Sequence, residues 1–419
     1  MNKKKESKVV PNVRFKGFTD DWKQRKLVDY LEVSSEKNRD NRFTKEDVLS
    51  VSGEYGIVNQ IEFQGRSFAG ASVSNYGVVE NGDVVYTKSP LKSNPYGIIK
   101  TNKGIPGIVS TLYAVYKPKE ITDSKFVQIY FELDSRMNSY MRPLVNKGAK
   151  NDMKVSAENA LKGMVSFPKK DEQEMISLYF STLDNLITLH QQKITLLTKL
   201  KKTMLEKMFP KKGSLIPEIR FNGFANAWEQ RKVLDLLIQP ITDGPHETPK
   251  LVEEGVPFIS VDAIVDNKID FNRKRGNISE EYDELCCKKY KPQFHDVYLV
   301  KSGSTVGKVA IVETTDRFNI WSPLAAMRCG EKTYPYFLYD LLQTKDLQAQ
   351  VADKASNGTQ PNLSMRELEK FPVSVPSNLE EQKKIGDYFR NLDHLITLHQ
   401  RKIDKIKNMK KAMLDQMFI

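Results

Sequence analysis

The chain has 419 residues, of which 39% are hydrophobic and 10% aromatic, so it can bury ordinary globular cores and is neither disordered nor collagen-like. Its 65 Lys and Arg exceed its 53 Asp and Glu and give a net charge of +12, which favours a polyanionic partner. At roughly 150 residues per domain, this length indicates two or three domains.

The cysteines and the apolar runs indicate the cellular compartment of the protein. Three cysteines are too few for a disulfide scaffold, and the adjacent pair Cys286-Cys287 does not have a zinc-site spacing. No apolar stretch approaches the ~20 residues that span a bilayer, and no apolar segment of the signal-peptide type follows the Lys-rich N-terminus. We therefore expect a cytoplasmic protein without a metal site of its own.

Two segments of the chain occur twice. Residues 14–26 (RFKGFTDDWKQRK) and 220–232 (RFNGFANAWEQRK) are identical at eight of thirteen positions, with an offset of 206. Residues 184–209 and 393–418 are identical at fifteen of twenty-six positions, with an offset of 209. The nearly equal offsets indicate two tandem halves, about 1–213 and 214–419. Between these segments only faint echoes remain, such as 83–89 with 296–302.

The middle of each half has the pattern of a mixed α/β domain. Short β-rich runs bounded by Gly, Pro and Asn predict strands at 77–79, 83–86, 108–116, 258–261, 296–300 and 309–312. Helical patterns follow at 123–142 and 334–355. Each middle is about 140 residues long, the size of one domain.

Each half ends in a long predicted helix, 171–209 and 379–419. At 1.5 Å per residue, ~38 residues would reach roughly 57 Å. Alternating steps of four and three define a coiled-coil seam, interrupted by Lys201 and Lys410, and the matching patterns predict that the two helices pair about a pseudo-two-fold axis. The other seam residues are Leu183, Ile187, His190, Ile194, Leu197, Met204, Met208, Leu392, Ile396, His399, Ile403, Ile406, Met413 and Met417.

Several segments imitate catalytic motifs without completing them. The run Gly303–Lys308 is one residue short of a phosphate-binding loop and has Val309 where such a loop has Ser or Thr, so we interpret it as a tight turn between strands. The run Ser93–Tyr96 lacks the second proline of an amino-methyltransferase motif. Asp243 with Asp266-Asn267-Lys268 is a weak imitation of a nuclease pair, and His246-Glu247 lacks the second histidine of a zincin. The sequence therefore favours a recognition or scaffold component, with no catalytic residues assigned.

Two dissimilar middles, each framed by repeated segments and followed by a long helix, resemble the specificity (S) subunit of type I restriction–modification enzymes. In the framework, the resemblance is carried by 14–26 and 220–232, by the Phe-Pro then acid-Gln segments at 167–173 and 371–382, and by Leu-Ile-Thr-Leu-His-Gln at 186–191 and 395–400. In the second middle it is carried by 243–246 (DGPH), 258–260 (FIS), 301–308 (KSGSTVGK) and 357–364 (NGTQPNLS).

The resemblance implies an α/β (α+β) fold, with two tandem mixed α/β target-recognition domains joined by two long antiparallel coiled-coil helices with pseudo-two-fold symmetry. The expected segments are a basic N-terminal arm and lead-in at 1–22, target-recognition domain 1 at 23–166, spacer helix 1 at 167–213, target-recognition domain 2 with its lead-in at 214–370, and spacer helix 2 at 371–419.

The resemblance also implies a non-catalytic subunit that binds double-stranded DNA at a bipartite, asymmetric target. Such a subunit directs two adenine-N6 methyltransferase subunits and two ATP-dependent restriction subunits to that target. S-adenosylmethionine, ATP and magnesium are expected on the partners and none on this chain. Two alternatives stay open: a solitary DNA-modifying methyltransferase or nuclease with fused recognition domains, and a coiled-coil scaffold that binds no nucleic acid.

Sequence-specific binding needs polar and basic side chains that reach base edges, and phosphate contacts supply affinity. The candidates in the first middle are Lys88, Ser89, Lys92, Ser93, Asn94, Tyr96 and Lys100. The candidates in the second middle are His246, Arg273, Lys274, Arg275, Lys301, Ser304, Thr305 and Lys308.

Overall fold

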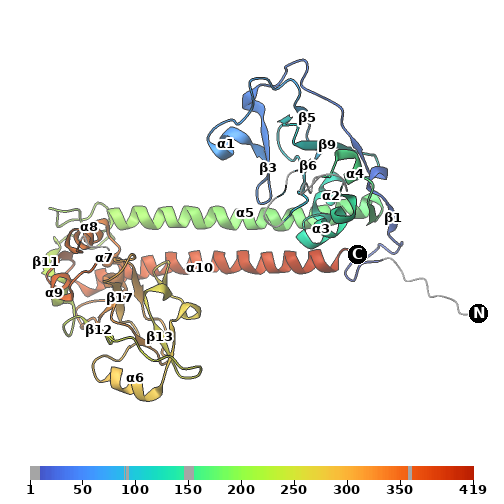
Figure 1. The fold of residues 1–419 in the computed structure, drawn as a ribbon. Helices are drawn as coiled ribbons and strands as arrows, with labels where there is room; N and C mark the ends of the chain where they lie inside the picture. Colours follow the sequence, from blue (N-terminus) through green and yellow to red (C-terminus); the bar gives the residue numbers. More distant parts are fainter. Residues whose placement is uncertain (1–9, 89, 91–93, 146–154, 357–360) are drawn as a thin grey trace, which may run out of the picture. The chain divides into compact units, whose positions relative to one another are not determined.

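The computed structural model describes residues 10–88, 90, 94–145, 155–356 and 361–419, which fold into two compact units (Figure 1). The first unit contains the described residues up to 190 together with 402–419, and the second contains 191–401. Each unit thus holds part of both long helices, α5 (Lys170–Lys207) and α10 (Leu379–Gln416). The units therefore do not coincide with the two sequence halves, because the C-terminal end of each helix belongs to the unit formed by the other half.

The first unit is built around a four-stranded antiparallel sheet with strand order β2-β9-β6-β7. Its strands are β2 (Leu31–Val33), β9 (Tyr113–Pro118), β6 (Val84–Thr87) and β7 (Ile99–Thr101). Two-stranded pairs are β1 (Lys23–Lys26) with β10 (Met164–Phe167), β3 (Leu49–Ser52) with β4 (Gly56–Asn59), and β5 (Gly77–Val79) with β8 (Gly107–Val109). Its short helices are α1 (Gln60–Gln64), α2 (Ser124–Tyr130), α3 (Asp134–Met141) and α4 (Ala157–Ala160).

The second unit repeats this plan with an antiparallel sheet of order β12-β20-β17-β18. Its strands are β12 (Thr242–Asp243), β20 (Leu324–Met327), β17 (Val297–Val300) and β18 (Val309–Ile311). The smaller sheets are β11 (Glu229–Lys232) with β21 (Pro372–Val375), β14 (Ile264–Val265) with β15 (Lys268–Ile269), and β16 (Gly276–Ile278), β13 (Val256–Ile259) and β19 (Asn319–Ile320). Its other helices are α6 (Glu280–Cys287), α7 (Pro335–Leu342), α8 (Lys345–Lys354) and α9 (Met365–Glu369).

The two sheets explain the faint echo between 83–89 and 296–302. These segments supply β6 and β17, which each lie between two hydrogen-bonded neighbours in their sheets. Every residue of both strands is buried, which accounts for their uninterrupted apolar runs. The prediction of two mixed α/β domains is confirmed.

Three predicted elements are each divided in two. The run 108–116 forms β8 and β9, the pattern at 123–142 forms α2 and α3, and the pattern at 334–355 forms α7 and α8. The last break falls at Thr344, whose Oγ1 accepts a hydrogen bond from the Leu347 amide at 3.4 Å and so caps α8. Local capping therefore restarts helices inside patterns that look continuous.

In both units a segment of α5 runs antiparallel to a segment of α10 (Figure 1). In the first unit Lys410 Nζ lies 2.6 Å from Asp184 Oδ1. In the second, Lys201 Nζ lies 2.7 Å from Asp393 Oδ2. Both lysines and both aspartates are separated by 209 residues in the sequence, so the same ion pair is made twice. The lysines that interrupt the seam thus find their partners on the opposite helix.

Burial along the two helices follows the seam pattern. All the seam residues are buried or half-buried, whereas the flanking leucines, such as Leu189 and Leu196, are 49% and 67% exposed. No helix in the described part of the chain is both long and apolar enough to cross a membrane.

The end of each long helix completes the core of the unit formed by the other half. Phe418 packs in the first unit, with its ring centroid 6.2 Å from that of Trp22 and 5.6 Å from that of Phe126. Phe209 packs in the second unit, 5.8 Å from Trp228 and 5.4 Å from Phe337. This exchange of helix ends gives the repeated Met-Phe pairs a structural role.

The repeated lead-ins are held by matching ion pairs. Arg14 Nε and Nη2 donate to the Glu172 carboxylate at 2.6 and 2.7 Å, and Arg220 donates in the same way to Glu381 at 2.6 and 2.8 Å. Both carboxylates are almost fully buried, and a bidentate arginine is the partner that suits such a group. The first Arg of the lead-in and the acid of the acid-Gln segment therefore form one framework contact.

Candidate nucleic-acid interface

Three basic side chains converge on one buried carboxylate in the second unit. Asp243, at the end of β12, is fully buried and pairs with Lys289. Its Oδ2 lies 3.2 Å from both Lys301 Nζ and His246 Nε2. Because one carboxylate faces two lysines and a histidine, the cluster keeps a net positive charge, which suits an anionic ligand.

Backbone contacts hold the loops around this cluster. The segment 243–246 approaches 320–322 so closely that a Cβ on Gly244 would lie 1.8 Å from the Ile320 carbonyl oxygen. The Ser322 amide donates to the Pro245 carbonyl at 3.2 Å. This position therefore requires glycine.

The same backbone bonding extends to the loop before α9. The Lys301 amide donates to the Pro323 carbonyl at 2.8 Å, and the Leu363 amide donates to the Lys301 carbonyl at 2.7 Å. The segments carrying the DGPH, KSGSTVGK and PNLS sequences thus form one loop cluster, which we call the Asp243 loop cluster. Residues 357–360 lie outside the described residues.

The Gly303–Lys308 run is a turn between β17 and β18, as predicted, and no helix follows it. Gly303 and Gly307 have φ angles of 99° and 95°, which glycine adopts without strain. Ser304 and Lys308 are exposed and Thr305 is half-buried; Lys308 Nζ donates to the Ile264 carbonyl at 3.2 Å. These three predicted candidates therefore belong to the Asp243 loop cluster.

The Asp266-Asn267-Lys268 triplet belongs to a β-hairpin. Asp266 and Asn267 have φ angles of 48° and 58° and connect β14 to β15, which is the backbone of a two-residue hairpin turn. Among the described residues no group of three or more His, Cys, Asp or Glu side chains is placed to hold a metal ion. The hairpin turn accounts for the triplet, and the basic cluster accounts for Asp243.

Beyond this hairpin, Arg273, Lys274 and Arg275 are exposed. The Arg275 guanidinium lies 4.1 Å from the ring centroid of Trp321, a stacking arrangement that holds a planar cation in place. The Trp321 Nε1 donates to the Glu247 carbonyl at 3.1 Å. This contact connects the basic segment to the loop that carries His246.

The comparisons with known proteins agree on one family. Residues 228–408 match the family model described as the type I restriction modification DNA specificity domain. The MjaVIII specificity subunit of Methanocaldococcus jannaschii is 25% identical over 345 residues, covering 77% of this chain and 75% of that protein. The putative MjaX specificity subunit of the same organism is 23% identical over 420 residues, covering 94% and 92%.

Solved structures share the fold over nearly the whole chain. The type I S subunit from M. genitalium superposes with a TM-score of 0.61 at 13% identity, covering 98% of this chain and 99% of that one. A chain from a structure of type I R-M complex assembly gives a TM-score of 0.51 at 15% identity, covering 95% and 97%. Residues 228–408 thus match the DNA specificity domain of type I restriction–modification systems, and the whole chain resembles the specificity subunits of these systems. The sequence-based resemblance, and the expectation of a specificity subunit instead of an enzyme, are confirmed.

In the first unit, two of the residues predicted to contact DNA are buried. Lys100 is 8% exposed and Asn94 is 5% exposed. The strand that carries Lys100, β7, is covered by α2, where the Thr101 Oγ1 donates to the Ser124 carbonyl at 2.7 Å. This burial lowers the pKa of Lys100. These side chains support the fold and are not positioned for a surface contact.

The other first-domain candidates lie in different settings. Lys88 is half-buried and its Nζ donates to the Thr111 carbonyl at 2.7 Å, while the Tyr96 carbonyl accepts from the Tyr86 hydroxyl at 2.6 Å. Ser89, Lys92 and Ser93 lie outside the described residues. The first unit thus retains Lys88 and Tyr96 as partly exposed candidates.

The sequence does not point to Lys289 or Trp321 as parts of the candidate interface. Lys289 follows α6, 46 residues from Asp243, and nothing in its local sequence distinguishes it from its neighbour Lys288. The DGPH segment was the available signal, since a buried acid in a tight turn requires basic partners from elsewhere in the fold.

We predict that Lys289→Met weakens DNA binding without changing the target sequence. The loss of one phosphate contact should reduce the slope of log affinity against log salt by about 0.9. Lys288→Met is the matched control, because Lys288 is exposed and, unlike Lys289, is not among the ion-pair partners of Asp243. A salt titration of binding by the assembled enzyme measures both slopes; equal slopes for the two variants would contradict a specific role for Lys289.

Proposed function

We propose that this chain is the DNA-reading subunit of a type I restriction–modification complex, and that it recognises a bipartite, asymmetric site without catalysis of its own. Each recognition domain reads one half of the site, and the paired helices α5 and α10 fix the distance between the halves. The assembled complex methylates adenine at N6 or, with restriction subunits, cleaves DNA. The cytoplasmic location expected from the sequence remains a prediction.

The observation that carries this proposal is the contrast between framework and loops. The two units share a four-stranded antiparallel sheet, the Arg–Glu ion pair of the lead-in and the Lys–Asp ion pair of the long helices. They differ in other elements: the first unit has the β3–β4 hairpin and α1, and the second has the β14–β15 hairpin and α6. Equal frameworks with unequal reading loops suit a target whose halves have unequal sequences.

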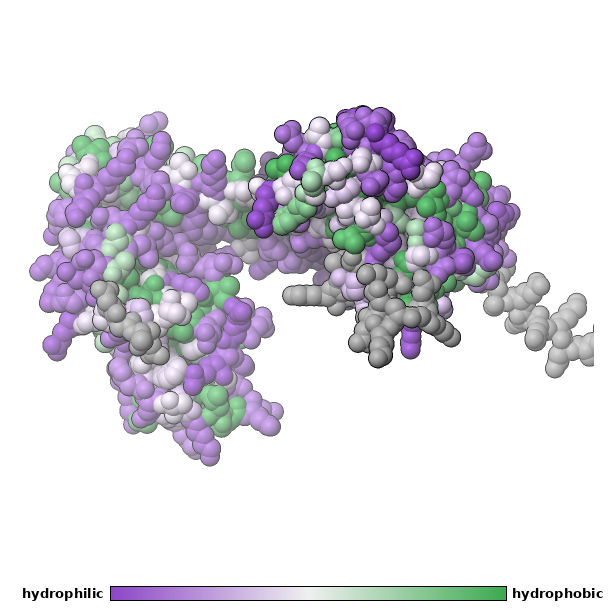
Figure 2. Space-filling model, turned by 45° about the horizontal axis from the view of Figure 1, so that its top comes forward, coloured by the Kyte–Doolittle hydropathy of each residue, from purple (hydrophilic) through white to green (hydrophobic). Residues whose placement is uncertain are grey.

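The charge distribution supports DNA as the ligand. The chain carries a net charge of +12, and hydrophilic residues dominate the visible surface of each unit (Figure 2). In the second unit exposed basic residues gather on the loops near Asp243 and on the segment 273–275. Phosphate contacts by such residues give sequence-independent affinity, while polar groups at base edges give specificity.

Exposed apolar residues on the long helices support two methyltransferase partners. Leu186 and Leu189, in the first unit, are 39% and 49% exposed. Their repeat counterparts Leu395 and Leu398, in the second unit, are 40% and 38% exposed. Because each unit presents the same leucine pair, each can receive a helix of one methyltransferase subunit. S-adenosylmethionine, and the ATP and magnesium used by two restriction subunits, would then be bound by the partners.

The runner-up function, a solitary methyltransferase or nuclease with fused recognition domains, is less well supported. The segments that imitated its motifs have structural explanations in the Gly303–Lys308 turn and the Asp266–Asn267 hairpin. The matched relatives are named specificity subunits. We therefore favour the division of labour in which catalysis belongs to other chains.

We expect the assembled enzyme to bind DNA with a steep salt dependence. If it contacts ~6–10 phosphates, its affinity should fall roughly 10³–10⁵-fold between 50 and 200 mM salt. Fluorescence anisotropy with a target duplex and a scrambled duplex measures both slopes. A flat titration for both duplexes would contradict a charge-driven DNA interface.

A further inference from the structure

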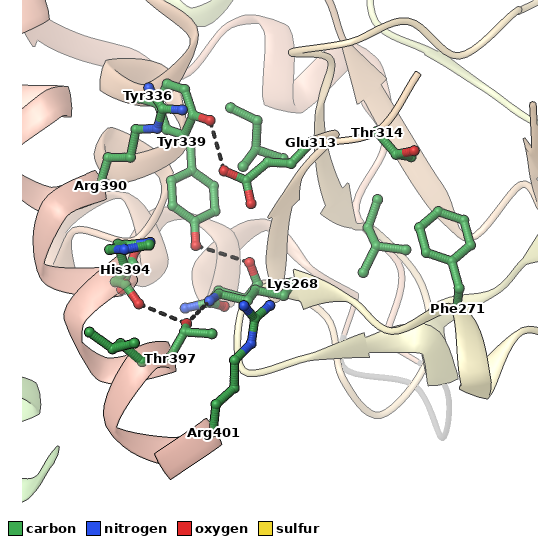
Figure 3. Close-up of a pocket in the computed structure, with 15 residues that line it drawn as sticks. Lys268, Phe271, Glu313, Thr314, Tyr336, Tyr339, Arg390, His394, Thr397 and Arg401 are labelled. Atoms are coloured by element: carbon green, nitrogen blue, oxygen red, sulfur yellow. Dashed lines mark hydrogen bonds between the residues drawn. The ribbon is translucent and has the colours of Figure 1, made fainter. Parts of the chain in front are cut away.

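The second unit contains a cleft whose basic side chains are not explained by any of the roles described above. It has a volume of about 420 Å³ and lies between α10, the β14–β15 hairpin and α7 (Figure 3). Basic residues reach it from two directions, with Arg390, His394 and Arg401 on α10 and Lys268 on β15. All of these residues belong to one compact unit.

The cleft has an excess of positive charge. Of the two carboxylates in its wall, Asp393 is paired with Lys201 at 2.7 Å. The other, Glu313, accepts a hydrogen bond from the Tyr336 hydroxyl at 2.7 Å. Lys268, Arg390 and Arg401 therefore face one carboxylate that has no lysine partner among the described residues. Such a surplus attracts an anion.

Two of the cations, Arg390 and Lys268, are held in place by neighbouring side chains, as Figure 3 shows. The Arg390 guanidinium lies 4.7 Å from the ring centroid of Tyr336, and Lys268 Nζ donates to the Thr397 hydroxyl. The Tyr339 hydroxyl donates to the Asn267 carbonyl at 2.9 Å and fixes the hairpin against α7. Groups ordered in advance lose less entropy when a ligand binds.

The internal repeat shows that these charges are not required by the helix framework. Six residues of α10 line the cleft, and the α5 positions 209 residues earlier provide a direct comparison. Asp393, Thr397 and Leu398 are identical to Asp184, Thr188 and Leu189. Arg390, His394 and Arg401 correspond to the neutral residues Ser181, Asn185 and Gln192. The basic groups are thus specific to the second copy.

We propose that this cleft binds the phosphodiester backbone of duplex DNA beside the half-site read by the second domain. The inference rests on the proposed function and adds a contact made by the long helix. Guanidinium groups match phosphate oxygens in geometry. The hairpin that supplies Lys268 leads directly into the exposed Arg273, Lys274 and Arg275, so the cleft continues a basic surface. This continuity favours DNA over an acidic protein segment.

The first helix supplies the test variant. In the full chain assembled with its methyltransferase partner, Arg390→Ser, His394→Asn and Arg401→Gln together transplant the α5 residues onto α10. Loss of about two phosphate contacts should lower the salt slope by about 1.8, so that from 50 to 200 mM salt the native affinity falls about tenfold more than the variant's. Specific and nonspecific duplexes should be affected alike, and the target sequence should not change.

The control is Lys407→Thr, which removes one exposed positive charge from α10 outside the cleft and installs the α5 residue Thr198. It should leave the slope unchanged, and Arg401→Lys should keep the native slope because it keeps the charge. Thermal unfolding verifies that each variant folds. If the triple variant does not fold, the single variant Arg401→Gln can replace it, because Arg401 is exposed. This variant should lower the slope of log DNA affinity against log salt by about 0.9.

Other outcomes would overturn the proposal. If the triple variant kept the native slope of log DNA affinity against log salt, the proposal would be wrong. If the same variant also lost methyltransferase binding, the cleft would be a site for an acidic protein segment. Loss of inorganic phosphate binding with an unchanged DNA slope would identify a small-anion site. If the native complex bound no duplex DNA at all, the proposed function itself would fail, whereas equal slopes with normal native binding would refute only the cleft.

Discussion

Phe418→Ala is expected to destabilise the first unit by about 3–5 kcal/mol, the usual effect of removing a buried aromatic ring. Phe418 is 5% exposed and contacts Trp22, Phe126, Tyr130 and Phe180. The residue is the next to last in the chain, yet it packs against the first sequence half. Chemical denaturation measures the loss, and hydrogen exchange should show it in α2.

The repeat provides the reciprocal experiment. Phe209→Ala should destabilise the second unit and increase exchange in α7, because Phe209 packs against Trp228 and Phe337. Ile419→Ala is the control, since this neighbour of Phe418 is 47% exposed and surface changes usually cost under about 0.5 kcal/mol. If Phe418→Ala increased hydrogen exchange in α7 and left α2 protected from exchange, Phe418 would not belong to the core of the first unit, and the described exchange of helix ends would be contradicted.

A fragment of residues 1–213 is expected to form a symmetric dimer and, with methyltransferase subunits, to methylate a palindromic interrupted site built from one native half. In the whole chain Met417 and Phe418 fill the first core, and Lys410 pairs with Asp184. The fragment carries Met208, Phe209 and Lys201 at the repeat-related positions. A second copy can therefore supply the missing helix end. Light scattering gives the mass, and sequencing of methylated DNA gives the site.

Within the fragment, the variant Lys201→Met tests the contribution of the helix seam to dimerisation separately from the folding of the domain core. This change leaves Asp184 without the lysine that a second copy would supply, and should weaken the dimer more than it unfolds the domain. Lys199→Met is the control, because Lys199 is exposed on α5 outside the predicted seam. A stable folded monomer, or a dimer that reads an asymmetric sequence, would show that the two halves do not substitute for one another.

Repetition and periodicity made the framework predictable. Two copies of the same helix pattern indicated a helix pair, because apolar residues at steps of three and four must be covered. In the sequence, Lys201 and Lys410 interrupt the apolar seam. Their role was not predictable, because their partners Asp393 and Asp184 lie on the opposite helix. The exchange of Phe209 and Phe418 between units was likewise invisible, because a sequence pattern shows that a residue is buried and not which domain buries it.

The interface was less predictable than the framework. The sequence predicts that Lys100 contacts DNA, but the covering of β7 by α2 buries this side chain. Lys289 was overlooked, because only the folded chain brings α6 beside Asp243. The basic residues of the α10 cleft were hidden within a repeat that suggested a purely structural helix. In each case tertiary contacts between distant segments decided which charges face the solvent.

We propose that the two units read DNA independently and share a repeated framework. The most direct test of this proposal is to sequence the methylated sites produced by the assembled enzyme, first with the native chain and then with residues 27–160 replaced by the corresponding segment of another specificity subunit. We expect an asymmetric two-part site for the native chain; after the exchange, one half should change while the other half and the spacing stay the same. A change in both halves, or methylation by the purified chain without its partners, would contradict the proposal.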